Sequence, residues 1–311
     1  MAVAFSGERL AVCDTGNNRV LLYRSVQDSS ASTVIGQLSP HGCGAGSGPG
    51  QLDRPSGVAL DGSRLAVCDV GSGRVLVYED VGRLPAAGAT ADLVVGAWDG
   101  GAGRHLAASF SSLTDVALEG EYLAVLDRGS SRVTLFALSG GSATVALDAA
   151  VAGGSWDPTS VSISDGRLAV ADSRGQRILV WEQIGSLSAG VRPDRVIELY
   201  PVLSPLLPLA KLDGPSDGGG EIYARLAGHE LCVVVALPEP LAVRGWFAEG
   251  AEVSELEAFA LSSLFGLGSG TAAGWCGLPG APGPGCWLVP DPLNHRVMGY
   301  SISPSTAPGP R

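Results

Sequence analysis

Five carboxylate–guanidinium pairs recur along the chain at one constant spacing. In each pair an Asp is followed five residues later by an Arg: Asp14 and Arg19, Asp69 and Arg74, Asp127 and Arg132, Asp172 and Arg177, and Asp291 and Arg296. A ring of carboxylates could hold a metal ion or transfer protons, but a pair that recurs in five copies of a repeat cannot serve one site in all of them. We therefore interpret the pairs as structural. The Asp accepts backbone N–H groups in a turn, and its pairing with the Arg sets the register of a hairpin.

The pairs lie in a repeated unit of short apolar segments. The segment Leu-Ala-Val-x-Asp begins at Leu10, Leu65, Leu123 and Leu168, and degraded copies begin at Leu231 and Trp287. After each Arg a second apolar run ends in an aromatic residue, as at Tyr23, Tyr78, Phe136, Trp181 and Tyr300. One further strand-like segment precedes this core and a looser one follows it. Each unit therefore predicts four short strands separated by turns.

Six such units predict an all-β fold, a six-bladed β-propeller of four-stranded antiparallel blades. The expected units lie near 1–50, 51–105, 106–155, 156–205, 206–268 and 269–302, so that 1–302 form a single domain. Residues 303–311, rich in Pro and Ser, are expected to be a disordered tail.

The fifth unit is expected to be an irregular blade, because Val235 and Pro240 replace the Asp and the Arg. Its segment 249–267 could be an amphipathic helix on the rim or an outer strand with a long loop. The departure could reflect drift in a blade held by its neighbours, or a segment that binds a partner.

The full unit resembles the NHL repeat. The stretch from Pro55 to Tyr78 is the closest example, and Asp14-Thr-Gly-Asn-Asn-Arg-Val20 matches the core motif of that family residue for residue. The segment Ala91-Asp-Leu-Val-Val-Gly96 is similar to the linker strand of bacterial NHL-repeat proteins. The resemblance covers residues 1–200 well and 285–302 moderately, and it implies a propeller without specifying an activity.

Catalytic six-bladed relatives carry metal ligands and acid–base residues where the innermost strands line the central tunnel. At those positions the sequence offers Asp115, with Glu221 nearby. Ca²⁺ prefers about six to eight oxygen ligands, several of them from carboxylates or amides, so this supply is thin. None of the four His lies at a spacing typical of metal ligands. We expect no cofactor. The alternative is a metal-dependent hydrolase or lyase of the six-bladed propeller type, with its site in the central tunnel and Ca²⁺ as the alternative cofactor.

The six Cys fall into separate groups. Cys13 and Cys68 occupy equivalent positions on expected buried strands and should behave as small apolar residues. Cys276 and Cys286 flank a run of Gly and Pro. If that run joins two strands of the last blade, the two thiols could face each other and form a disulfide. A metal pair or two free thiols stay open as alternatives.

Composition limits the partners. The chain has 311 residues, a formal net charge of −11 and 45% hydrophobic residues. The acidic charge disfavours nucleic acid, which needs a dense basic surface, and no apolar run approaches the length of a membrane span. No signal peptide is visible. However, the sequence starts directly on an expected inner strand, so an extracytoplasmic location after loss of upstream sequence stays open.

The interpretation favoured by the sequence is a non-catalytic scaffold that binds a protein, peptide or glycan through one face and its loops.

Overall fold

A computed structural model gives the fold. It describes residues 2–98, 100–139, 142–154, 156–188, 190–198, 221–227, 230–236, 242–249, 252–260, 274–276, 286–291 and 296–301. Side chains are described up to residue 198, apart from residues 142–144, and for Ala224, Arg225 and Leu226. The expected tail at 303–311 lies outside the described residues.

The first half of the chain forms three sheets in which successive strands pair antiparallel, except for β9, which pairs parallel to β8. The first sheet contains β1 (Val3–Ser6), β2 (Arg9–Asp14), β3 (Arg19–Tyr23) and β4 (Thr33–Ile35). The second contains β5 (Pro55–Asp61), β6 (Arg64–Asp69), β7 (Arg74–Tyr78), β8 (Leu93–Gly96) and a fifth strand, β9 (Arg104–Leu106). The third contains β10 (Leu113–Glu119), β11 (Tyr122–Asp127), β12 (Arg132–Ala137) and β13 (Ser142–Leu147).

The second half continues the same order. One sheet contains β14 (Pro158–Ser164), β15 (Arg167–Asp172), β16 (Arg177–Trp181) and β17 (Arg195–Glu198). The next contains β18 (Glu221–Ala227), β19 (Glu230–Ala236), β20 (Ala242–Glu249) and β21 (Glu252–Ala260). In the described part of the last sheet, β22 (Gly274–Cys276), β23 (Cys286–Asp291) and β24 (Arg296–Ser301) pair in sequence order. Throughout the described residues, the helical elements are short 3-10 turns, η1 to η5.

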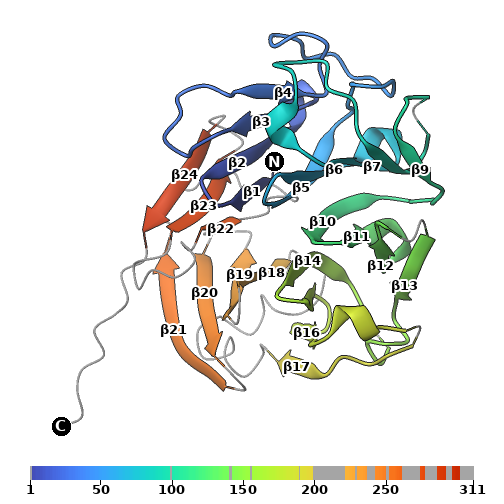
Figure 1. The fold of residues 1–311 in the computed structure, drawn as a ribbon. Coiled ribbons are helices and arrows are strands. Elements are labelled where there is room, and N and C mark those ends of the chain that lie inside the picture. The colour runs from blue at the N-terminus through green and yellow to red at the C-terminus, as the bar shows by residue number, and fades with distance from the viewer. Residues whose placement is uncertain are drawn as a thin grey trace.

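The sheets stand around a common centre. The first strands of successive sheets contact one another in the order β1, β5, β10, β14, β18 and β22, and β22 contacts β1. Figure 1 shows these strands on the inner side of the ring, with β4, β9, β13, β17 and β21 on the outer side. The all-β prediction is therefore confirmed, and the arrangement is propeller-like.

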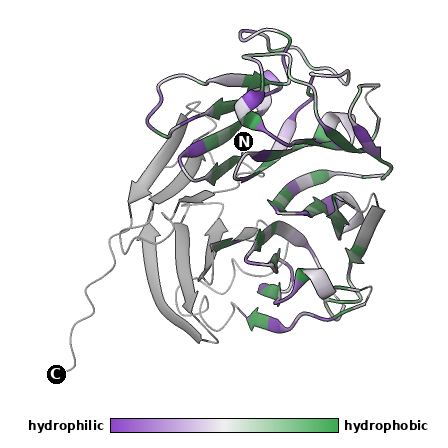
Figure 2. Ribbon diagram, viewed as in Figure 1, coloured by the Kyte–Doolittle hydropathy of each residue, from purple (hydrophilic) through white to green (hydrophobic). Residues whose placement is uncertain are grey.

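The sequence forms strands here because its apolar runs are covered on both faces. Val67, Leu123 and Val170 are fully buried on the second strands of their sheets, and so are their neighbours Ala66 and Ala124. Small Ala residues let adjacent sheets approach closely, while Leu and Val fill the space between them. Figure 2 shows the apolar colour concentrated on the strands and the polar colour on the turns and connecting loops.

Two elements bear on expectations from the sequence. Within the segment predicted as helix or outer strand, the described residues form strand β21, so the strand alternative is confirmed for Glu252–Ala260. The parallel strand β9 was not expected. It forms because the chain after β8 turns back, and Arg104 N–H donates to the Asp92 carbonyl at 2.8 Å. In the described part of the chain, no helix has the length and apolar character needed to cross a membrane.

Cys276 and Cys286 are direct partners in the β22–β23 ladder. Their side chains lie outside the described residues, but their register bears on the proposed disulfide. Opposed residues of antiparallel strands have Cα atoms roughly 4.5–5.5 Å apart, which lies within the span that a disulfide bridges.

We predict that Cys276 and Cys286 form a disulfide in protein purified without reductant. Intact mass under denaturing conditions after iodoacetamide treatment should show four alkylated thiols, and six once reductant is added. Peptide mapping should assign the four to Cys13, Cys43, Cys68 and Cys232, and the two added by reduction to Cys276 and Cys286. Alkylation of both residues without reductant would show that the thiols are free.

Candidate functional site

The repeated Asp and Arg oppose each other across the turn in every copy. The ladders pair Asp14 with Arg19, Asp69 with Arg74, Asp127 with Arg132, Asp172 with Arg177, and Asp291 with Arg296. Between the two strands lies a short turn whose last residue has a left-handed backbone: Asn18, Gly73, Ser131 and Gln176 in the first four copies. This turn brings the Arg back over the Asp, as the constant spacing predicts.

The second copy shows the complete interaction. Arg74 Nε donates to Asp69 Oδ2 at 2.8 Å, and the two side chains are 1% and 0% exposed. Arg74 also donates to the carbonyls of Ser47 and Gln51 at 2.6 and 3.0 Å, while Asp69 Oδ1 accepts the Asp53 N–H at 2.6 Å. The pair therefore anchors the glycine-rich loop that leads from β4 into β5.

Two other copies use the same geometry with more exposure. Arg177 Nε lies 2.9 Å from Asp172 Oδ2, and Arg177 Nη2 donates to the Ala152 carbonyl of the preceding loop. Arg19 Nε lies 2.8 Å from Asp14 Oδ2 at a more exposed turn. The side chains of the fifth pair, Asp291 and Arg296, lie outside the described residues.

The third copy departs from the expected pairing. Asp127 accepts the backbone N–H groups of Ser111 and Ser112 at 2.8 and 2.6 Å and the Ser130 hydroxyl at 2.8 Å. Because these donors occupy the carboxylate, Arg132 points into solvent and is exposed. The expectation of an Asp127–Arg132 side-chain pair is corrected accordingly, although the backbone register is as predicted.

Different surroundings shift the pKa values of these carboxyls in opposite directions. Burial raises the pKa of Asp69, against the lowering effects of the Asp53 N–H and of Arg74. At the less buried Asp127, burial also acts to raise the pKa. There the hydrogen bonds from Ser111, Ser112 and Ser130 outweigh it and lower the pKa.

A second set of contacts joins neighbouring sheets at their opposite ends. In the first three sheets, the last residue of the inner strand accepts N–H groups from the inner hairpin of the next sheet. Ser6 accepts Gly62 N–H at 2.9 Å, Asp61 accepts Gly120 N–H at 2.7 Å, and Glu119 accepts Asp165 N–H at 2.6 Å. Sequence reasoning missed this set because the acceptor changes from Ser to Asp to Glu. The available signal was an acceptor directly before a turn Gly, as in Asp61-Gly62.

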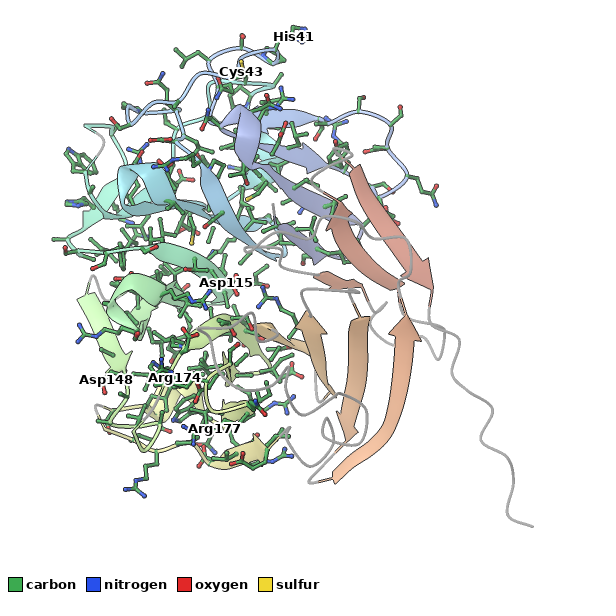
Figure 3. The ribbon with its side chains drawn as sticks, turned by 180° about the vertical axis from the view of Figure 1, so that it is seen from behind. His41, Cys43, Asp115, Asp148, Arg174 and Arg177 are labelled. Atoms are coloured by element: carbon green, nitrogen blue, oxygen red, sulfur yellow. The ribbon has the colours of Figure 1, made fainter. Side chains whose placement is uncertain are left out.

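The two carboxylates expected near the tunnel are Asp115 and Glu221. Asp115 is 4% exposed and lies toward the middle of the ring (Figure 3). Its Oδ2 and Oδ1 atoms accept hydrogen bonds from Arg225 Nη1 at 2.9 Å and Nη2 at 3.2 Å. Oδ2 also accepts the Val161 N–H at 3.1 Å. The Glu221 backbone lies in β18, and its side chain is outside the described residues.

Asp115 thus belongs to a contact among three inner strands. Arg225 of β18 also donates to the Val161 carbonyl of β14 at 2.8 Å. Ser160 and Ser162 of β14 accept the N–H groups of Ala224 and Leu226 at 2.8 and 2.9 Å. The carboxylate is neutralised by a guanidinium in a two-point ion pair. Among the side chains that the structure describes, no three His, Cys, Asp or Glu cluster as metal ligands would.

Cys13 and Cys68, on the second strands of the first two sheets, are unreactive thiols. Burial raises the pKa of Cys13 to about 12 and raises that of Cys68 well above its ordinary value. Thiols in this state stay protonated and are poor nucleophiles, which agrees with the expectation that they pack as apolar residues. Cys43 and His41 lie on an exposed outer loop (Figure 3).

A groove of about 820 Å³ lies between the first and second sheets. One wall contains the β1–β2 turn and the residues beside β3 and β4, and the other contains Leu60, Gly62 and the segment 81–86. Leu60 and Leu84 contribute partly exposed apolar side chains, and Arg9 and Arg24 also line the groove. Its size lies in the range of sites that bind small ligands or short chain segments.

Comparisons with known proteins place the fold and go no further. No protein-family model and no curated protein sequence matches the chain. Hydrazine synthase from Kuenenia stuttgartiensis aligns over 97% of this chain and 76% of its own, with a TM-score of 0.53 and 13% identity. A candidate 6-phosphogluconolactonase from Bacteroides uniformis aligns over 98% of this chain and 81% of its own, with a TM-score of 0.54 and 12% identity. At such identities the likeness concerns the propeller-like fold alone.

The contrast between Arg74 and Arg132 yields a stability prediction. Arg74→Ala removes one partner of a buried ion pair and should lower the free energy of unfolding by about 3–5 kcal/mol. Arg132→Ala, at the same motif position but exposed, should change it by about 0.5 kcal/mol or less. Urea unfolding of both variants measures the difference, and similar losses would contradict the structural role assigned to Arg74.

The lowered pKa of Asp127 yields a pH prediction. A carboxyl whose folded-state pKa is depressed contributes stability above its unfolded pKa, of about 3.9, and loses it as the pH falls through the folded pKa. The stability difference between wild type and Asp127→Asn should therefore be constant above pH 5 and shrink below pH 4. Urea unfolding at a series of pH values measures this difference. A pH-independent difference would contradict the assignment.

Proposed function

We propose that the chain is a six-bladed β-propeller of the NHL type, with the β18–β21 sheet as its divergent fifth blade. The ring of inner strands and the common strand order support this assignment. The Asp–Arg turn that carries the resemblance supports it further, because it recurs at the same register in five sheets. In the β18–β21 sheet, Val235 of β19 occupies the position that Asp holds in the other five sheets.

We propose further that the propeller is a non-catalytic scaffold that binds a protein, peptide or glycan through one face and its loops. The observation that carries this proposal is the two-point contact between Asp115 and Arg225. A carboxylate bound to a guanidinium and to a backbone N–H has few lone pairs left for a cation or for proton transfer. The net charge of −11 disfavours nucleic acid as the partner.

The alternative is a metal-dependent hydrolase or lyase with Ca²⁺ held near Asp115 and Glu221. The two functions predict opposite responses to calcium. A site that binds Ca²⁺ only in the folded state would raise the unfolding temperature as the metal is added, whereas an Asp115–Arg225 pair already in place would not respond.

We predict that purified protein carries no stoichiometric Ca²⁺ or Zn²⁺ by elemental analysis and that millimolar Ca²⁺ leaves its unfolding temperature unchanged. Asp115→Ala should lower the free energy of unfolding by about 3–5 kcal/mol, because it leaves Arg225 largely buried without its anion. Arg24→Ala, on the exposed rim, is the control and should change stability little. One equivalent of bound metal, lost in Asp115→Asn, would overturn the proposal.

A further inference from the structure

The groove between the first two sheets contains a charge arrangement that the next sheets lack. Arg9 begins β2, and Arg24 directly follows β3. Leu10 pairs with Tyr23, so one further step along the ladder places Arg9 opposite Arg24. Both residues line the groove. Directly opposed like charges destabilise a pair of strands.

Two other sheets hold an acidic residue at the position of Arg24, and the third sheet holds Ala137 there, opposite Tyr122. In the second sheet Leu65 pairs with Tyr78, and the next two residues form an ion pair, with Arg64 Nε 2.6 Å from Glu79 Oε2. In the fourth sheet the same step places Arg167 opposite Glu182. The first sheet therefore replaces an acidic partner by Arg24.

Within the described part of the chain, Asp28 Oδ2 accepts the backbone N–H of Arg24 at 3.1 Å but forms no ion pair with its guanidinium. Arg9 Nη1 donates to the Gly62 carbonyl at 3.0 Å, and neither Arg9 nor Arg24 forms an ion pair there. Glu8 also lines the groove. The equivalent residue of the third sheet, Glu121, reaches back to Arg64 of the preceding sheet. Arg9 and Arg24 thus line one groove, and neither guanidinium forms an ion pair with a described side chain.

We propose that this groove binds a short acidic peptide segment, with a ligand carboxylate between Arg9 and Arg24. Arg presents a planar fork of donors that suits a carboxylate. Beside the two Arg, the groove offers aliphatic surface from the partly exposed Leu60 and Leu84 and the exposed Ala86, which suits apolar side chains next to the acidic one. The aliphatic surface favours a peptide over an anionic sugar. This inference rests on the proposed binding function and names its site and ligand class.

Calorimetric titration tests the proposal with an acetylated and amidated hexapeptide of alternating Glu and Leu. Wild type should bind this peptide and should bind the Gln and Leu counterpart about tenfold more weakly or worse, because the neutral peptide lacks charge-assisted hydrogen bonds. Arg24→Glu installs the arrangement of the second sheet. It should fold, unfold at a higher temperature than wild type, and bind the acidic peptide at least about tenfold more weakly.

Two controls separate the site from general electrostatics. Arg174→Glu changes the net charge by the same amount at an exposed turn of the fourth sheet and should bind the acidic peptide as wild type does. Arg24→Gln should weaken binding without introducing a repelling charge. Equal binding by wild type and Arg24→Glu, or no binding by wild type, would overturn the proposal.

Two further ligands test the chemical class. Sodium acetate at equal carboxylate concentration should not reproduce the affinity, and oligogalacturonate should bind more weakly than the peptide. Tighter binding of oligogalacturonate would assign the groove to an anionic glycan and overturn the peptide proposal. Absence of peptide binding would overturn the proposed peptide site without contradicting the non-catalytic scaffold function. Stoichiometric bound calcium would contradict the scaffold function, whether or not the peptide binds.

Discussion

The structure depends on directional contacts between polar groups of neighbouring sheets. Apolar packing between the sheets is strong but non-directional, so it does not by itself fix how one sheet is placed against the next. Hydrogen bonds at both ends of the sheets supply that direction. Asp69 and Arg74 fix a connecting loop at one end, and Asp61 fixes the hairpin of the following sheet at the other. Near the centre, Asp115 joins strands that are far apart in sequence.

Buried charge in such a ring is a matter of specificity as much as of stability. Removing Asp69 and Arg74 from water costs free energy that their attraction only partly offsets. Further hydrogen bonds reduce the remaining desolvation cost. Arg74 donates its other N–H groups to loop carbonyls, and the second oxygen of Asp69 accepts a backbone N–H. A pair satisfied in this way permits one position of the loop and penalises others, since any shift leaves a buried charge without a partner. The Asp–Arg spacing therefore has a structural explanation that requires no reaction.

How far the sequence predicts this molecule depends on repetition. The strands, their order and the opposition of Asp and Arg recur, so one copy supports the interpretation of another, and the described strands agree with it. Contacts that occur once carry no such signal. The pairing of Asp115 with Arg225 joins residues in different sheets, and nothing local to either residue indicates the other. Repetition can also mislead. Asp127 has the predicted backbone register, but its carboxylate is bound by three nearby donors and not by the Arg that the motif predicts.

Repetition also makes a departure from the pattern informative. The position of Glu79 and Glu182 is held in the first sheet by Arg24, an exposed residue at the edge of a groove. An opposed pair of like charges costs roughly 0.2–1 kcal/mol, a small part of the stability of a domain. The fold can therefore tolerate the pair, and an anion bound between the two guanidinium groups recovers that cost as binding free energy. The same magnitudes limit the affinity: a site built from two partly exposed Arg and a few aliphatic side chains suits reversible binding of a short segment rather than permanent association.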